Sequence, residues 1–170
     1  MPENEIALIL KGVTIHNRMT NQSSTTETNI TQPLYQQDYY LWLTTTAQKL
    51  RQGKLAEVDL ANLIEEIEDM GRSERKAIRS NLRILLMHLL KYKYQPEKRT
   101  NSWLFTIVEH RKRLKESFKD SPSLKRYFSE VFDECYQDAI DLAAAETGLP
   151  RETFPNQSPF TPEETLNPDY

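Results

Sequence analysis

The sequence predicts an all-α fold: a single-domain bundle of about four main helices, with a long central helix and an extended, proline-containing C-terminal tail. Three observations lead to this fold. Apolar residues recur every three or four positions, no stretch alternates with a period of two, and glycine or proline stands at most boundaries between the periodic stretches. With 170 residues, 38% hydrophobic and 28% charged, the chain suits one domain with its own core.

Residues 1–33 are predicted to be a disordered leader, and the helical domain to cover residues 34–168. Residues 20–33 are almost all polar, so they bury too little apolar surface to become ordered. Met19 is a second possible start. Residues 1–18 are therefore either part of the functional protein or an upstream extension.

Neither export nor a membrane span is expected. The longest apolar run near the start, residues 6–10, is too short to cross a bilayer, and acidic residues precede it where a signal peptide carries basic ones. Cys135 is the only cysteine, so the chain has no intramolecular disulfide and no thiolate cluster for a metal. We expect a cytoplasmic protein in a reducing compartment.

The first helix is expected over residues 35–52, with Trp42 and Leu50 on its apolar face and Gly53 placed to end it. The second begins after Asp59, a capping residue, and continues to about Tyr94. Gly71 lies inside it, which leaves open one long helix or two collinear ones. Its apolar stripe comprises Leu60, Leu63, Ile64, Ile67, Met70, Ile78, Leu82, Leu85, Leu86 and Leu89.

Residues 84–90 (ILLMHLL) are apolar around nearly the whole helix, so they should form the buried centre. Beyond Pro96, a third amphipathic helix carries Trp103, Ile107, His110, Leu114 and Phe118. Ser121 and Pro122 are predicted to cap and start a fourth helix, which closes before Gly148. The tail is expected to be extended up to a short capped turn at TPEE, residues 161–164, and to be pinned by Phe154 and Phe160.

Several strings, taken in order, together resemble one known family. They are YQQDYYLWL, DLANLIEEIEDMGRSER, LLMHLLKYKYQPEKR followed by SW, DSPSL, and AAAETGLP followed by FP. The chain is similar to the bacterial, mainly cyanobacterial, family called domain of unknown function 29 (DUF29). The resemblance covers residues 34–168 and implies an all-helical fold. It implies no activity and no site residues, because none is known to carry over.

Charge is unevenly distributed along the chain. Residues 71–115 contain 13 Lys and Arg but only 3 Glu, although the whole chain has a net charge of −3. A candidate basic surface, interleaved with aromatic residues, comprises Lys91, Lys93, Lys98, Arg99, Arg111, Lys112, Arg113 and Lys115.

Acidic residues on the second and fourth helices can pair with these cations within the chain or between subunits; those of the fourth helix are Glu130, Glu134, Asp138 and Asp141. The charge pattern favours such pairing over a separate protein partner. It favours a protein partner over nucleic acid, because the sequence pI is near 5.7.

Three carboxylates, those of Glu65, Glu68 and Asp69, lie on one side of the second helix and form a weak candidate metal site. Arg72 falls on the same side, so the pattern favours a salt-bridge network. No cofactor is expected, because the isolated glycines form no phosphate-binding loop, and HExxH, GxSxG and paired-cysteine motifs are absent from the sequence.

His88, His110 and Glu146 are the candidate catalytic residues, because all three are predicted to point towards the core. Convergent polar groups form acid–base and metal sites, but they also form hydrogen-bonded cores. Helical di-metal bundles place Glu three residues before His, whereas here Leu85 and Ile107 take those positions. The pattern therefore favours a structural role.

The function that the sequence favours is a small, non-catalytic helical interaction protein that binds a protein partner or its own copy through a charge-polarised surface. One alternative is a metal-dependent or acid/base enzyme that uses the buried His and Glu residues. The other is a nucleic-acid-binding protein that uses the basic segment 91–115.

Overall fold

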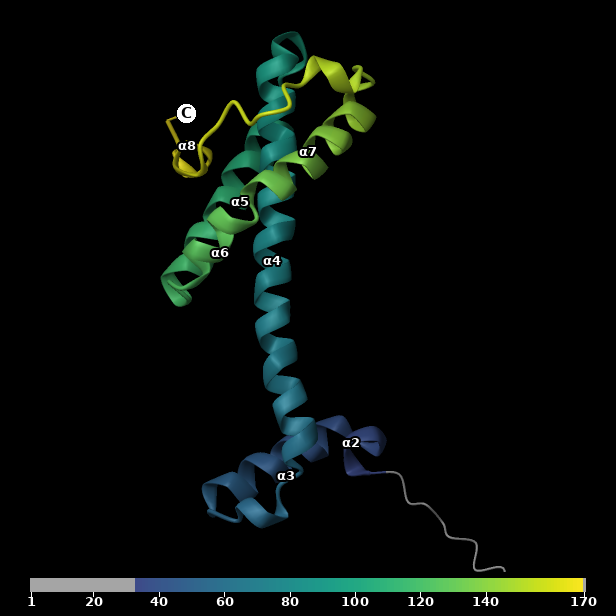
Figure 1. Cartoon of the computed structure of the whole chain (residues 1–170), viewed down its shortest axis with the longest axis vertical. Helices are drawn as coiled ribbons and strands as arrows, with labels where there is room; N and C mark the ends of the chain where they lie inside the picture. The colour runs from purple at the N-terminus through teal and green to yellow at the C-terminus, as the bar shows by residue number, and fades with distance from the viewer. Residues whose placement is uncertain (1–32, 170) are drawn as a thin grey trace, which may run out of the picture. The chain divides into compact units, whose positions relative to one another are not determined.

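The central helix is one continuous element, α4, which runs from Leu60 to Tyr94 without a break at Gly71 (Figure 1). The computed structural model describes residues 33–169, and these contain seven α-helices and no strand, which confirms the all-α prediction. They divide into two compact units, one ending at Asp59 and the other beginning at Leu60, and each is described by itself. Residues 1–32 of the predicted leader, which include Met19, lie outside the described residues.

The first unit contains α2 (Leu34–Gln37), α3 (Tyr39–Arg51) and the 3₁₀ turn η1 (Leu55–Glu57). The prediction of a single helix over residues 35–52 was wrong at Asp38. Its backbone is extended, and its side chain accepts a hydrogen bond from the Leu41 amide at 2.9 Å, so Asp38 caps α3 instead of continuing α2.

The apolar face of α3 is held by aromatic contacts within this unit. Trp42 is buried, and its ring lies edge-on to the Tyr35 ring at 4.9 Å between centroids. Gly53 follows the helix with a φ of +72°, which favours glycine and confirms its predicted place at the helix end.

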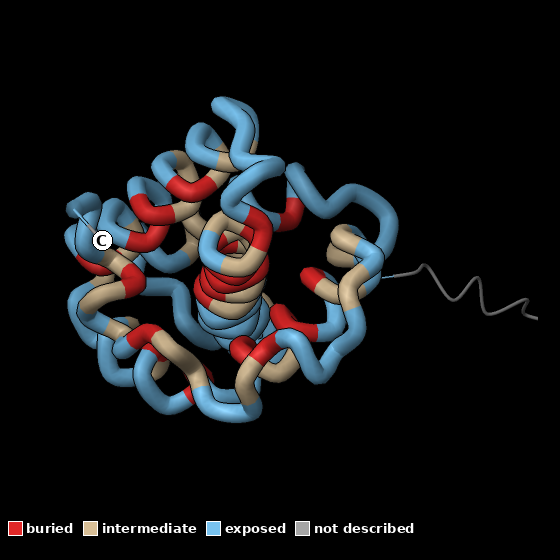
Figure 2. Tube along the Cα trace, turned by 90° about the horizontal axis from the view of Figure 1, so that it is seen from above, coloured by how far each residue is buried: buried red, intermediate tan, exposed pale blue. Residues whose placement is uncertain are grey.

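In the second unit, helices from the C-terminal part of the chain pack against α4. They are α5 (Asn101–Asp120), α6 (Leu124–Glu130) and α7 (Phe132–Thr147). The short α8 (Pro162–Leu166) contacts α5, and the unit also contains the 3₁₀ turns η2 (Pro96–Lys98) and η3 (Arg151–Thr153). Both α5 and α7 make extensive contacts with α4. The buried residues of α4 begin at Ile78, and the buried segments of the other helices gather around it (Figure 2). The predicted buried centre, residues 84–90, is confirmed at this place.

The fourth predicted helix was wrong in two respects. Ser121 does not start it: its amide donates to Ser117 O at 2.8 Å and so closes the last turn of α5. The helix also divides at Val131 into α6 and α7. Because Val131 is buried and keeps the three-and-four spacing across the break, the apolar pattern does not reveal it.

The C-terminal boundaries follow the prediction closely. Gly148 ends α7 with a φ of +72°. Thr161 and Glu164 form a reciprocal capping box at the start of α8, and Phe154 and Phe160 are buried in the core. Among residues 33–169, no helix combines the length and apolar character that a membrane span requires.

Candidate functional site

Two of the three predicted polar residues, His88 and Glu146, interact with one buried cation, Lys91. Lys91 is only 1% exposed, and its Nζ lies 2.5 Å from Glu146 Oε1 and 4.3 Å from the centroid of the Trp103 ring. His110 shares a hydrogen bond of 2.8 Å between its Nδ1 and Asn81 Oδ1. Glu146 and His110 are thus each engaged with a partner.

His88 lies on α4 within the electrostatic reach of these groups. Burial, and secondly the Lys91 ammonium, lower its pKa to about 4, so the imidazole is neutral at physiological pH. Its Nδ1 is buried and has no hydrogen-bond partner in the described part of the chain. The cluster therefore consists of a neutral imidazole and a closed ion pair, an arrangement that suits a core better than proton transfer.

Two residues of the predicted basic surface are buried and do not belong to it. Lys91 is buried as above, and Arg111 is 6% exposed, with its Nε donating to Thr165 O at 2.9 Å, so it anchors α8. Long cationic side chains are packed inside by their tertiary neighbours, which the sequence pattern does not report. The remaining predicted members are exposed: Lys93, Lys98, Arg99, Lys112, Arg113 and Lys115.

Several of these exposed cations already have partners. Arg113 pairs with Glu109 at 2.9 Å along α5, and Lys112 approaches Glu116 at 3.9 Å. The Arg99 guanidinium lies 4.2 Å from the centroid of the Tyr92 ring, so this ring is covered. Lys112 and Lys115 also line a groove on α5 beside Leu104 and Val108.

The carboxylates proposed as a weak metal site contact an arginine in the same helix. Arg72 donates to Asp69 Oδ1 at 2.7 Å through Nε and reaches Glu68 Oε2 at 3.5 Å. Both pairs are exposed, so each contributes little to stability. In the described residues no group of three His, Cys, Asp or Glu side chains is placed to hold a metal ion.

A cleft of about 400 Å³ lies between α4 and the helices α6 and α7, and the sequence did not predict it as a site. Five cations line it, all from α4, and we call it the basic cleft. Its lining comprises Arg72, Arg75, Lys76, Arg79, Ser80 and Arg83 of α4 with Tyr127, Cys135 and Asp138 of the facing helices.

The family model for "Domain of unknown function DUF29" matches residues 34–170, nearly the whole described chain. The chain belongs to the DUF29 family. The resemblance in the sequence is thereby confirmed. No curated protein and no solved structure matches it.

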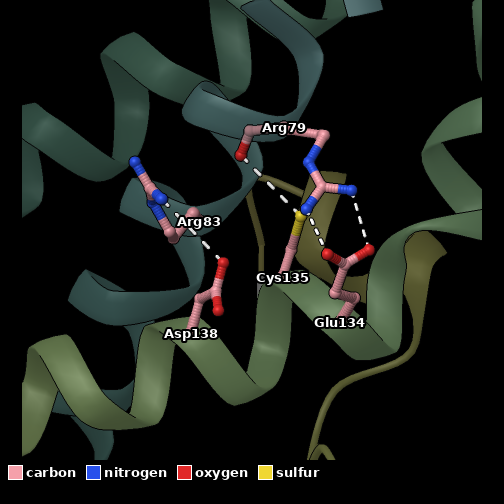
Figure 3. A network of polar contacts seen from close by, with 5 residues as sticks. All are labelled: Arg79, Arg83, Glu134, Cys135 and Asp138. Carbon is pink, nitrogen blue, oxygen red and sulfur yellow. Dashed lines mark hydrogen bonds and ion pairs between the residues drawn. The ribbon is translucent and has the colours of Figure 1, made fainter. Parts of the chain in front are cut away.

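In this DUF29 chain the inner wall of the basic cleft is held by ion pairs between α4 and α7 (Figure 3). Arg79 binds both carboxylate oxygens of Glu134, with 2.7 Å between Nη1 and Oε2, and Arg83 approaches Asp138 Oδ2 at 3.9 Å. Of the four acidic residues predicted to pair with the basic stretch 71–115, Glu134 and Asp138 do so, whereas Glu130 and Asp141 pair with Arg126 and Arg151 outside it. The bidentate contact lowers the pKa of Glu134 and raises that of Arg79, so the pair stays ionised.

The outer end of the basic cleft is less neutralised. The Arg75 guanidinium lies 5.0 Å from the centroid of the Tyr127 ring. At the inner wall, by contrast, the buried Arg83 Nε has no hydrogen-bond partner among the described residues. Lys76 is exposed and makes no ion pair within the described residues. This end can therefore accept carboxylate or phosphate oxygens.

Cys135 lies at the base of the basic cleft of this DUF29 chain. It is 1% exposed, and its Sγ lies 3.8 Å from Arg79 O. Burial raises the pKa of its thiol, with a smaller opposing contribution from Arg79. A buried, protonated thiol is a core group and a poor nucleophile.

One signal in the sequence points to the basic cleft. The cations of α4 recur at positions 72, 75, 76, 79 and 83, the three-and-four spacing of one helix face. Sequence reasoning instead emphasised residues 91–115, because aromatic residues are interleaved with cations there. The packing of α7 against α4 then brings carboxylates opposite these cations and completes the site.

Proposed function

We propose that this chain is a non-catalytic interaction protein that binds an acidic segment of another polypeptide in its basic cleft. The observation that carries the proposal is the charge of the lining: five Arg and Lys against one Asp. A neighbouring polypeptide with closely spaced carboxylates would complement this charge, and its association would be accelerated by long-range attraction.

Two features favour an acidic protein segment over nucleic acid. Glu134 and Asp138 stand beside the cations and repel any anion placed next to them; a polypeptide can place neutral residues there, whereas a nucleic acid carries a phosphate charge at every nucleotide. The Tyr127 ring is already in contact with the Arg75 guanidinium, so it is not free to stack on a base. The net charge of −3 further opposes non-specific binding to nucleic acids.

The non-catalytic part of the proposal is supported by the state of the reactive groups. The pKa of the Cys135 thiol is raised by burial, and that of His88 is lowered by burial. Glu146 is paired with Lys91. A single buried cysteine also suits a reducing environment, and we propose the cytoplasm of a bacterial cell as the location.

The test measures the fluorescence anisotropy of a labelled decaglutamate peptide titrated with the full chain. We expect binding that weakens steeply with salt, and at least about tenfold weaker binding by the variant Arg75→Glu/Lys76→Glu. The matched control is Lys54→Glu/Lys98→Glu, which changes the net charge equally at exposed lysines outside the cleft. We expect this control to bind about as well as the wild type.

Two outcomes would overturn the proposal. One is equal loss of binding in both double variants, because the attraction would then be one of net charge alone. The other is tighter binding of a single-stranded RNA of ten nucleotides than of the peptide, with the same dependence on Arg75 and Lys76, which would assign the cleft to nucleic acid.

A further inference from the structure

A second groove, separate from the basic cleft, runs along α5. Its volume is about 380 Å³, which is within the range of sites that bind small molecules, and it shares no lining residue with the basic cleft. We call it the α5 groove. The residues on which its chemistry depends are Leu104, Val108, Lys112, Lys115 and Lys119 of α5, together with Pro168 from the tail that follows α8.

The five α5 residues form one continuous stripe. Positions 104, 108, 112, 115 and 119 follow the three-and-four spacing of a single helix face. The opposite side of α5 carries Ile107, Leu114 and Phe118, which are buried in the hydrophobic core. The stripe is therefore turned away from the core.

The stripe changes its chemistry along the helix. At its N-terminal end, Leu104 and Val108 are 45% and 54% exposed, and Pro168 adds a further apolar wall. From position 112 onwards the stripe consists of lysines. A complementary ligand has an apolar part at one end and a negative charge at the other.

The positive charge of the lysine end is only partly neutralised. Lys115 and Lys119 make no ion pair within the described residues. Glu116 is the one carboxylate among the lining residues, and it lies 3.9 Å from Lys112. Both members of this pair are more than half exposed, so a competing anion displaces it at little cost.

The apolar end of the groove favours an alkyl chain over an extended polypeptide. The side chains of Leu104, Val108 and Pro168 neither donate nor accept hydrogen bonds. An extended polypeptide laid on them would leave backbone amides and carbonyls without partners, which is costly. An alkyl chain has no such groups and is stabilised by leaving water.

The length of the stripe suits a single chain of about twelve carbons. Leu104 and Lys115 are 11 residues apart, about 16 Å at 1.5 Å per residue. An extended chain of twelve carbons spans about 14 Å, because each bond of about 1.5 Å advances it by about 1.3 Å. Such a chain reaches from the apolar end to the lysines.

We propose that the α5 groove binds a single-chain aliphatic carboxylate, a fatty acid of medium or long chain. Its alkyl chain lies along Leu104 and Val108, and its carboxylate lies between Lys115 and Lys119. This site goes beyond the proposed function, because it takes a different ligand on a different surface. Either site can therefore fail its test without affecting the other.

The test is isothermal titration calorimetry of the full chain with dodecanoate, at neutral pH, at low salt and below the micelle concentration. We expect about one molecule per chain and a dissociation constant of about 10–100 μM for a ligand of this size. Lys115→Glu/Lys119→Glu should raise this constant at least about tenfold, because the carboxylate is then repelled. The matched control, Lys54→Glu/Lys98→Glu, changes the net charge equally outside the groove and should stay within about twofold of the wild type.

A second pair of variants tests the apolar end. Val108→Asp places a charge beside the alkyl chain and should weaken dodecanoate binding at least about tenfold. Phe105→Asp is the matched control, because Phe105 is an exposed apolar residue of α5 that does not line the groove. We expect this control to bind dodecanoate within about twofold of the wild type.

Two further ligands separate the contributions of head and tail. Butyrate, which keeps the carboxylate but lacks most of the chain, should show no measurable binding. Dodecyltrimethylammonium, which has the same alkyl chain and the opposite charge, should bind at least about tenfold more weakly than dodecanoate. Equal binding of the two twelve-carbon ligands would overturn the proposal, because the lysines would then have no part in recognition.

Three other outcomes would also overturn the proposal. The first is the absence of saturable dodecanoate binding by the wild type. The second is an equal loss of binding in both lysine double variants, which would reduce the attraction to net charge. The third is binding to phosphatidylglycerol vesicles, but not to dodecanoate, that depends on Val108 and Lys115, which would assign this face to a membrane surface.

Discussion

The ammonium group of Lys91 is buried against Glu146, whose own side chain is half exposed: Nζ lies 2.5 Å from Oε1, and the two side chains are 1% and 48% exposed. The two partners therefore differ in what their removal leaves behind. Without Glu146, the lysine charge is buried and unpaired. Without the lysine charge, the carboxylate is still hydrated.

This asymmetry predicts unequal effects of two substitutions. Glu146→Gln should lower the free energy of unfolding by about 2 kcal/mol, whereas Lys91→Met, which keeps the apolar stem beside Trp103, should change it by less than about 1 kcal/mol. Urea denaturation of both variants at one protein concentration measures the difference. An equal or larger loss for Lys91→Met would contradict the asymmetry.

The imidazole of His88 predicts a loss of stability in mild acid. Its pKa in the folded chain, about 4, lies below the ordinary value near 6.5, so between these values the unfolded chain binds the extra proton. Stability is therefore complete above about pH 6.5 and falls as the pH drops. From about pH 6.5 to 5 the loss due to His88 should be about 2 kcal/mol.

The measurement compares the pH dependence of urea unfolding for the wild type and His88→Leu. The pKa of His110 is also lowered by burial, so the variant should retain a shallower slope in the same range. Parallel curves for the two proteins would show that His88 is not the buried titrating group.

The fold of this chain was predictable wherever a boundary depends on local chemistry. Gly148 ends α7 because only a left-handed residue closes that turn, and Thr161 with Glu164 caps α8 through side chains three positions apart. The continuity of α4 at Gly71 was left open, because one glycine lowers helix propensity without forbidding the helix.

The features that were missed depend on contacts distant in sequence. Arg111 is buried because α8 returns to cover α5, and the basic cleft exists because Glu134 and Asp138 of α7 face α4. Of the predicted polar residues, His110 and Glu146 both act electrostatically on His88, but the buried partner of Glu146, Lys91, had been placed on the surface. Helical periodicity shows which face of a helix is apolar, but it does not show which distant element packs against that face.

The thiol of Cys135 should be protected from alkylation in the folded protein. It is 1% exposed, and burial raises its pKa, so both access and thiolate population are low. At neutral pH we expect iodoacetamide to label it at least about a hundredfold more slowly in buffer than in denaturing urea. Rapid labelling of the native chain, followed by mass spectrometry, would argue against a structural thiol.

Arg111 predicts a specific effect on the C-terminal helix. Its Nε donates to Thr165 O at 2.9 Å, and Thr165 is fully buried, so Arg111→Met leaves that carbonyl without this donor. We expect a loss of about 2 kcal/mol and faster hydrogen exchange in α8. The matched control is Arg113→Met on the same helix, which removes only an exposed pair with Glu109 and should cost less than about 0.5 kcal/mol.

The most direct test of the central claim, that the basic end of α4 holds carboxylates of another polypeptide, is zero-length cross-linking of the full chain to the decaglutamate peptide. Carbodiimide joins an amine to a carboxylate only when the two are in contact. We predict a cross-link between Lys76 and a carboxylate of the peptide. Recovery of Lys76 unmodified, or joined only to carboxylates of its own chain, would contradict the account.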